Sequence, residues 1–153
     1  MNRLELRLPP PLIALAVGLV MAGLARITPT LSLMEGMRPW LPAALAAVGV
    51  LIAIVAVVSF RQARTTIHPL SPQKSSALVQ GGLFRFSRNP MYLGMALVLL
   101  AWSFWLGAPA TLIGPVAFVA VITRLQILPE ERALRALFGA GYDDYCRRTR
   151  RWL

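Results

Sequence analysis

Charged residues are missing from three long stretches of the chain, at 8–25, 39–60 and 89–123. About 20 apolar residues carry an α-helix across the hydrocarbon core of a bilayer. The first two stretches each match one crossing, whereas the third is too long for one and long enough for two short ones. Gly107 and Pro109 interrupt the third stretch, and both residue types suit a tight turn. The pattern therefore predicts an all-α fold with four transmembrane helices, near 9–27, 39–60, 90–106 and 109–128.

Polar residues gather in two segments, one between the second and third predicted helices and one after the fourth. We expect residues 61–89 to form an ordered loop that ends at Asn89, a good N-cap, with Pro90 at the first helical position. The tail after residue 128 is amphipathic, which predicts an interfacial helix that Pro129 begins or kinks. Glu131 would then favour the positive end of the helix dipole and pair with Arg135 at i,i+4.

The composition agrees with a protein whose solvent is partly lipid. Hydrophobic residues make up 57% of the 153 residues and charged residues 14%. Soluble domains are nearer half apolar and a quarter charged, and a soluble chain of this length cannot bury so many apolar side chains. We expect one membrane-embedded domain over residues 1–153, with the first apolar helix retained rather than cleaved as a signal peptide.

The net charge of +10 sits mostly on one predicted side of the membrane. Lysines and arginines precede the first helix, lie between the second and third, and follow the fourth, and such residues favour the cytoplasmic side. This predicts an integral protein of the bacterial inner membrane with both termini in the cytoplasm, in contact with anionic lipids. Because no nucleic-acid motif accompanies the charge, nucleic acid is not expected as a partner. The composition leaves the oligomeric state open.

Metal and thiol chemistry receive little support. The chain has one cysteine, Cys146, and one histidine, His68, and no Cys/His cluster has the spacing of metal ligands. No metal site is predicted, and neither residue is expected to be catalytic.

Glycines, arginines, an Asn-Pro step and aromatics crowd together at residues 81–94, at the mouth of the third helix. This stretch, with Glu130 and Glu131 after the fourth helix and Arg151-Trp152-Leu153 at the end, resembles the isoprenylcysteine carboxyl methyltransferase and phospholipid methyltransferase group of membrane enzymes. The resemblance runs from about residue 76 to 153 and rests on order and spacing together.

The resemblance implies S-adenosylmethionine as cofactor and assigns roles to particular residues. Backbone atoms of the segment 76–79 would contact the cofactor, and further residues would complete its pocket: Ser76, Ala77, Leu78, Val79, Phe84, Asn89, Pro90, Met91, Tyr92 and Glu130. Arg88 and Arg124 are the candidate catalytic residues, Arg88 to hold a carboxylate and Arg124 to orient an anionic acceptor.

The sequence departs from the family pattern at two positions. Asn89 stands where the family pattern Arg-His-Pro-x-Tyr-x-Gly has histidine, and asparagine can donate and accept hydrogen bonds but carries no positive charge. Some family members carry a substrate-binding arginine four residues before the first glutamate, where this chain has Gln126. Gln126 and Arg124 are therefore both candidates for substrate binding.

The expected activity is methyl transfer to a lipophilic, carboxylate-bearing acceptor at the cytoplasmic membrane face. Two alternatives keep the fold: methylation of a phospholipid amine, and a non-catalytic membrane scaffold. A membrane reductase that uses a nicotinamide cofactor is a third, although the chain has no nicotinamide motif.

Overall fold

The computed structural model describes residues 6, 8–30, 40–63 and 77–153. Within these residues the regular structure is helical, with one isolated bridge between Ser87 and Arg150. The helices are α1 (Pro10–Ile27), α2 (Trp40–Gln62), α3 (Pro90–Leu106), α4 (Ile113–Ile122), α5 (Leu128–Phe138) and α6 (Ala140–Arg148). Three short elements join them: the 3-10 turns η3 (Gly82–Arg85) and η4 (Pro109–Leu112) and the π-helix η5 (Thr123–Ile127). The all-α prediction is confirmed for the described residues.

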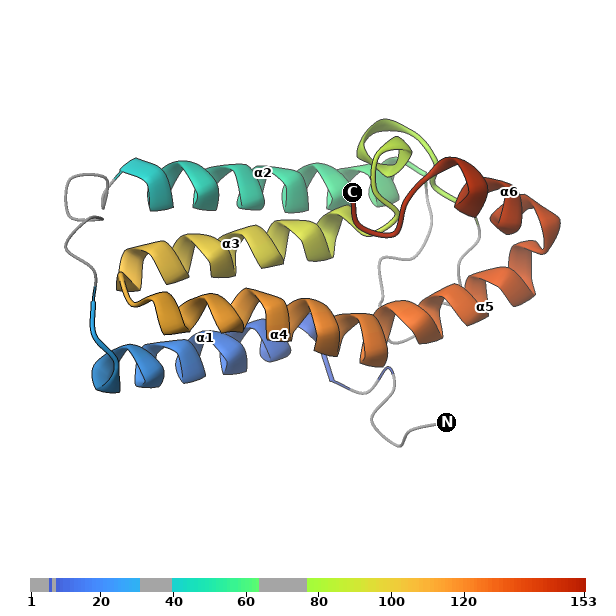
Figure 1. Ribbon diagram of the computed structural model, residues 1–153. Helices are drawn as coiled ribbons and strands as arrows, with labels where there is room; N and C mark the ends of the chain where they lie inside the picture. The colour runs from blue at the N-terminus through green and yellow to red at the C-terminus, as the bar shows by residue number, and fades with distance from the viewer. Residues whose placement is uncertain (1–5, 7, 31–39, 64–76) are drawn as a thin grey trace.

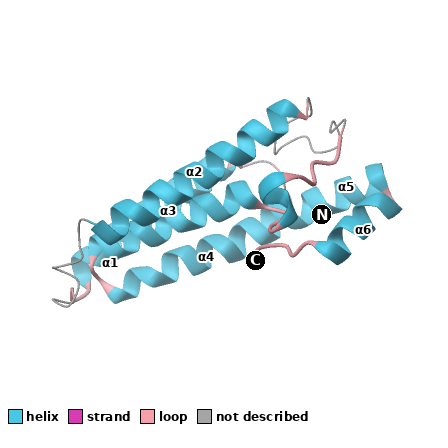
Figure 2. Cartoon of the chain, turned by 90° about the horizontal axis from the view of Figure 1, so that it is seen from above, coloured by secondary structure: helices cyan, strands magenta, loops and turns pink. Residues whose placement is uncertain are grey.

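The first four α-helices lie side by side, and α5 extends α4 beyond the end of this bundle (Figures 1 and 2). At that end α6 folds back, and the last residues of the chain run across the start of α3 (Figure 1). The beginning of α1 and the turn η3 lie at the same end. The loop before α3 and the C-terminal tail therefore meet, as the placement of basic residues suggested.

Three helical runs are long and apolar enough to cross a membrane: Pro10–Ile27, Trp40–Gln62 and Pro109–Phe138. The third predicted helix corresponds to α3, an apolar helix of 17 residues. At ~1.5 Å per residue it is about 26 Å long, somewhat short of a ~30 Å hydrocarbon core. The structure thus supplies helices at all four predicted places, and three of them have the length of a full crossing.

The fourth helix ends later than the sequence predicts, because Pro129 neither starts a separate helix nor breaks this one. A proline within an α-helix has no N–H for the carbonyl four residues earlier and clashes with it. Here a π-helical turn precedes the proline, with the Leu128 N–H donating to Thr123 O. The freed Leu125 O accepts a 3.1 Å hydrogen bond from the Leu6 N–H. The π-turn carries the helix through Pro129 and brings Glu130 and Glu131 beyond the apolar part.

Small residues let α2 and α3 pack closely. A Cβ at Gly49 would lie 2.6 Å from the carbonyl oxygen of Gly94, and a Cβ at Gly94 would collide with the Gly49 carbonyl. Such contacts between glycines are a common way for membrane helices to associate. The pair α2–α3 is therefore fixed by backbone contact.

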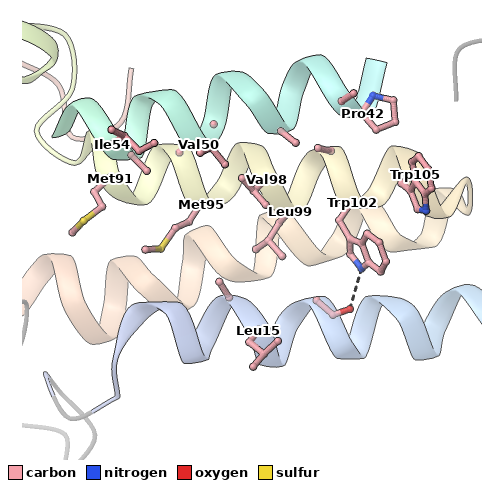
Figure 3. A pocket seen from close by; sticks show the side chains of 18 of the residues that line it. Leu15, Pro42, Val50, Ile54, Met91, Met95, Val98, Leu99, Trp102 and Trp105 are labelled. Carbon is pink, nitrogen blue, oxygen red and sulfur yellow. Dashed lines mark hydrogen bonds between the residues drawn. The ribbon is translucent and has the colours of Figure 1, made fainter. Parts of the chain in front are cut away.

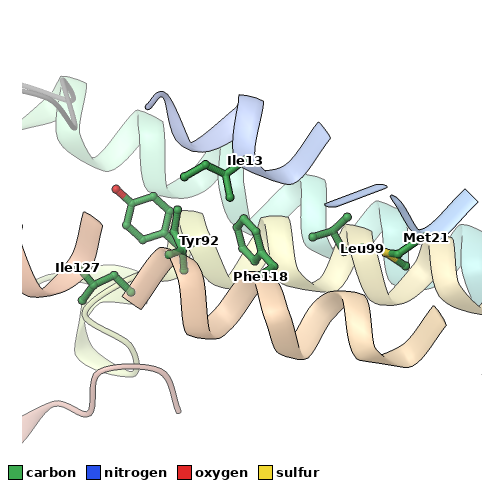
Figure 4. Packing of buried hydrophobic residues seen from close by; sticks show 7 residues of the cluster. Ile13, Met21, Tyr92, Leu99, Phe118 and Ile127 are labelled. Carbon is green, nitrogen blue, oxygen red and sulfur yellow. The ribbon is translucent and has the colours of Figure 1, made fainter. Parts of the chain in front are cut away.

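Large buried side chains lie instead between α1, α3, α4 and η5 (Figure 4). Tyr92 and Leu99 of α3 meet Phe118 of α4, with Ile13 and Met21 contributed by α1. Helix α2 buries only Pro42, Gly49 and Ala56, so most of its apolar surface is exposed. An exposed apolar surface of this kind fits contact with lipid.

Helix α3 begins and ends where the sequence predicts. Pro90 occupies the first helical position, and Gly107 ends the helix in the left-handed conformation, with φ of 69°. Asn89 is the N-cap residue, yet its side chain makes no capping hydrogen bond. The predicted capping role of the Asn89 side chain is therefore wrong, and the amide group has another partner in the tail.

Candidate functional site

The end of the bundle where α3 begins is held to the C-terminal tail by hydrogen bonds between distant parts of the chain. Arg88 N–H donates to Arg150 O over 2.9 Å, and the Asn89 amide Nδ2 donates to Arg151 O over 3.0 Å. The Ser87 hydroxyl accepts from the Asn89 N–H over 3.1 Å. The tail therefore lies against the very stretch that the sequence singles out.

Glu131 lies between two arginines that are distant in the sequence, one just before α3 and one near the chain end. Arg88 Nη2 is 2.9 Å from Glu131 Oε1, and Arg151 donates from Nε (2.9 Å) and Nη2 (2.7 Å) to both carboxylate oxygens. Only 10% of the Glu131 side chain and 11% of the Arg88 side chain are exposed. We call Arg88, Glu131 and Arg151 the tail clamp, because together they join the start of α3, α5 and the chain end.

The partners of Glu131 differ from those that its spacing suggests. Arg135 pairs with Asp143 at 2.7 Å rather than with Glu131 at i,i+4. Since α5 continues from the π-helix without a free N-terminus, a dipole role for Glu131 also has no structural basis. Both expectations are corrected: Glu131 is a tertiary ion-pair residue.

Glu130 points to α3 and has a different environment. The Tyr92 hydroxyl donates a 2.5 Å hydrogen bond to Glu130 Oε1. Glu130 forms no ion pair with the described residues, in contrast to Glu131. Tyr92 is itself 3% exposed and belongs to the hydrophobic core. The acidic side chain of Glu130 is thus fixed in orientation by a buried tyrosine and has no cation beside it among the described residues.

Tyr145 of α6 ties the tail to the turn before α3. Its hydroxyl donates to Phe84 O over 2.7 Å. Burial raises the pKa of the Tyr145 phenol above its ordinary value, which keeps the hydroxyl protonated as the donor. The Phe84 ring is 4% exposed and meets Phe60 of α2 edge-on, with 5.0 Å between ring centroids. Phe84 is therefore both a packing residue and an acceptor for the tail.

The other candidates for the cofactor pocket lie in or near this region, except one. Pro90 is buried at the start of α3, and Met91 is half-buried beside it. Residues 77–79 form a half-buried irregular segment before η3. Ser76 lies outside the described residues. The fold thus brings Tyr92 and Glu130 together, with Asn89, Pro90 and Met91 directly before Tyr92 in sequence.

The two candidate residues for substrate binding, Gln126 and Arg124, differ in burial. Gln126 is fully buried in the π-helix, and its Nε2 donates to Leu8 O over 2.6 Å, which joins it to the segment before α1. Its Oε1 is buried and has no hydrogen-bond partner in the part of the chain that the structure describes. Arg124 is exposed on the same turn and makes no hydrogen bond or ion pair with the described residues. Of the two, Arg124 has its side chain accessible to an anion from outside.

Sequence reasoning assigned no role to Arg151, although it noted the terminal Arg-Trp-Leu. It also missed the acceptors for Arg88 Nη1, which are the carbonyls of Thr149 (2.6 Å) and Cys146 (3.3 Å). A backbone carbonyl has no sequence signature, so only the fold identifies these contacts. The cluster of arginines near the chain end was the sequence feature that could have indicated the tail clamp.

Comparison with known proteins identifies the family of the chain. A family model described as phospholipid methyltransferase matches residues 37–141. The chain belongs to the phospholipid methyltransferase family. The family match includes all of α2 and reaches into α6, so it starts earlier than the motif resemblance and stops before the terminal arginines. Membership points to a membrane methyltransferase.

One curated relative is similar over part of the chain. An uncharacterised protein of Haemophilus influenzae is 44% identical over 63 residues, which is 41% of this chain and the whole of the relative. No solved structure matches the chain. The resemblance that the sequence motifs suggested is therefore confirmed at the level of the family.

Proposed function

We propose that this chain transfers a methyl group from S-adenosylmethionine to a lipophilic acceptor at the cytoplasmic face of the bacterial inner membrane. The observation that carries the proposal is Glu130, an acidic side chain fixed by Tyr92 at the mouth of α3 with no ion-pair partner among the described residues. An acidic side chain so placed is suited to bind ribose hydroxyls or an ammonium group. The family supports methyl transfer, and the residues around Glu130 support the choice of cofactor.

The residues present fit part of the cofactor by their chemistry. When bound, S-adenosylmethionine supplies an electrophilic methyl group on a sulfonium. Glu130 would bind its ribose or ammonium group, and the segment 76–79 would offer backbone groups. We further propose that Asn89, Pro90, Met91 and Tyr92 form the wall of the pocket at the start of α3, with Phe84 behind it.

Arg88 enters the proposal as a positioning residue. The carboxylate that Arg88 binds within the chain is Glu131, and its Nη1 is occupied by tail carbonyls. We propose that Arg88 acts through Glu131 and the tail, which hold the neighbouring Glu130 in place. The exposed Arg124 would then be the residue that orients an anionic acceptor.

The acceptor is proposed to bear a carboxylate. Displacement of a methyl group can be accelerated largely by holding the two centres close and aligned, which is worth about 7–11 kcal/mol in favourable cases. A carboxylate is already deprotonated and needs no general base, in agreement with asparagine at position 89. The family description favours a second candidate, a phospholipid amine, whose nucleophile has a proton to lose.

The proposal is tested by ligand binding in detergent. Purified wild-type protein should bind S-adenosylhomocysteine in calorimetry, and Glu130→Ala should weaken binding at least about tenfold, the loss expected for one charge-assisted hydrogen bond. Asp144→Ala is a suitable control because Asp144 is an exposed residue of α6 that pairs with Arg147. If wild type gives neither heat nor a thermal shift at millimolar ligand, the methyltransferase proposal fails and the scaffold interpretation takes its place.

A further inference from the structure

A groove of about 940 Å³ runs along the bundle between α1 and α2, and α3 forms its floor (Figure 3). Helices α1 and α2 each pack on α3 rather than on each other, which leaves this side of the bundle open. Large apolar side chains line it and are exposed, among them Leu15 of α1 and Val50 and Ile54 of α2. Small-molecule sites usually have about 300–1,000 Å³, so the groove has the size of a ligand site.

One charged residue, Arg61, is among the described residues that line the groove. It lies in the last turn of α2, is exposed, and makes no hydrogen bond or ion pair with the described residues. An apolar groove with a single unpaired cation at one end complements a molecule with an apolar body and one anionic group. Lipids of the membrane have this chemistry.

The charged end of the groove coincides with the candidate site. Phe60, which precedes Arg61, contacts Phe84 of η3, and Met91 lines the groove one residue before Tyr92. The opposite end is lined by Trp102 and Trp105, and Trp102 Nε1 donates to Gly18 O across the groove over 3.2 Å (Figure 3).

The groove is long enough for a lipid chain. At ~1.5 Å per residue, its floor from Met91 to Trp105 is about 21 Å long. Half of a ~30 Å hydrocarbon core is about 15 Å, so a chain from one leaflet fits along the floor with its polar end toward Arg61.

We propose that this groove holds the apolar chain of one membrane lipid whose anionic group, a phosphate or a carboxylate, is bound by Arg61. Arg61 is then the residue that selects charged over uncharged lipids. That the bound lipid is the methyl acceptor rests on the proposed function, because the headgroup would lie near Met91 and hence near Tyr92. The lipid site itself stands on the groove and on Arg61.

Native mass spectrometry of the full chain in detergent tests this proposal with three lipid probes. Oleate offers a carboxylate, dioleoylphosphatidylglycerol a phosphate, and dioleoylglycerol no charge. Wild type should retain one or both anionic probes, and which one it retains identifies the anionic group. Arg61→Gln should lower that occupancy at least about tenfold, the loss of one charge-assisted hydrogen bond, and leave dioleoylglycerol unchanged. Arg85→Gln, an exposed arginine of η3, should have no effect.

A matched pair on α2 tests the groove itself. Val48 and Val50 are both 49% exposed, but only Val50 lines the groove. Val50→Trp should reduce lipid occupancy to background, whereas Val48→Trp should keep the wild-type value. Leu15→Trp blocks the groove from the opposite wall, so the prediction survives if one variant fails to fold.

The proposal is overturned if wild type retains no anionic probe, if both tryptophan variants of α2 lose lipid equally, or if Arg61→Gln has no effect. A dimer that disappears in Val50→Trp would overturn it in favour of a second copy of the chain in the groove. S-adenosylhomocysteine binding by Val50→Trp should equal that of wild type. Failure of the lipid site therefore remains distinguishable from failure of the cofactor site.

Discussion

Replacing Glu131 by glutamine tests whether the tail clamp stabilises the fold. The substitution keeps the size of the side chain but removes the charge that Arg88 and Arg151 share. Arg88 would retain its carbonyl partners, Thr149 and Cys146, but would lose its carboxylate. An arginine with 11% of its side chain exposed would then be left without a counter-ion.

The expected cost follows from the burial of the two arginines. Breaking a buried ion pair from one side typically costs about 3–5 kcal/mol, since it leaves an uncompensated charge. Arg151 is 38% exposed, so water replaces part of what it loses, and its share should be small. The remaining carbonyl contacts of Arg88 lower the cost further. We therefore expect the lower end of the range, about 3 kcal/mol, or roughly 6–12 °C in Tm for a chain of this length.

Thermal unfolding in detergent, followed by circular dichroism at a helix wavelength, measures this shift. Asp143→Asn is the control, because the Arg135–Asp143 pair is exposed on both sides (51% and 45%) and should contribute no more than about 1 kcal/mol. If Glu131→Gln melts within about 2 °C of Asp143→Asn, the burial argument for the clamp is refuted.

Two further substitutions test the packing and the tail contact. Gly94→Ala should destabilise the protein by about 1–3 kcal/mol in detergent unfolding, since the new Cβ meets the Gly49 backbone. Gly23→Ala, with nothing within 4 Å of its Cβ, should be neutral or stabilising, and equal effects of the two would contradict the close packing of α2 and α3. Asn89→Ala removes the donor to Arg151 O and should cost about 1 kcal/mol in the same assay, so an unchanged Tm would mean that this contact contributes nothing.

Hydrophobic patterning was sufficient for the places of the long helices, although among the described residues three of the four predicted spans have the length of a full membrane crossing. It ended the fourth helix too early at Pro129, which was expected to begin or kink a further helix: the proline lies in the first turn of α5, but the helical run is continuous from Pro109 to Phe138. The π-turn accommodates the proline, and the Leu125 O that it leaves without a helical donor is bound by Leu6, a residue far away in the sequence. Helix propensity depends on neighbouring residues and therefore cannot predict a hydrogen bond from a residue far away in the sequence.

The sequence predicted which residues form the candidate site better than it predicted the contacts between them. Motif order brought Tyr92 and Glu130 forward, and they share a hydrogen bond. The partner predicted for Glu131 was wrong, since spacing along one helix cannot reveal that Arg88 and Arg151 bind it from other parts of the chain. The i,i+4 spacing points to Arg135 as the partner of Glu131, but in the fold Arg135 pairs with Asp143.

Asn89 shows how the departure from the family pattern bears on the acceptor. Its amide donates to Arg151 O, so asparagine retains a donor at this place but supplies no titratable base.

Among the described acidic residues, Glu131, Asp143 and Asp144 each pair with arginine, which leaves Glu130 as the carboxylate without a cation. Transfer to an amine would require a group to take its proton, and in this region that task falls to Glu130. Transfer to a carboxylate requires none, so Glu130 is then free to bind the cofactor alone. The two acceptors consequently make opposite demands on one side chain, and asparagine at position 89 is the reason that we propose the carboxylate.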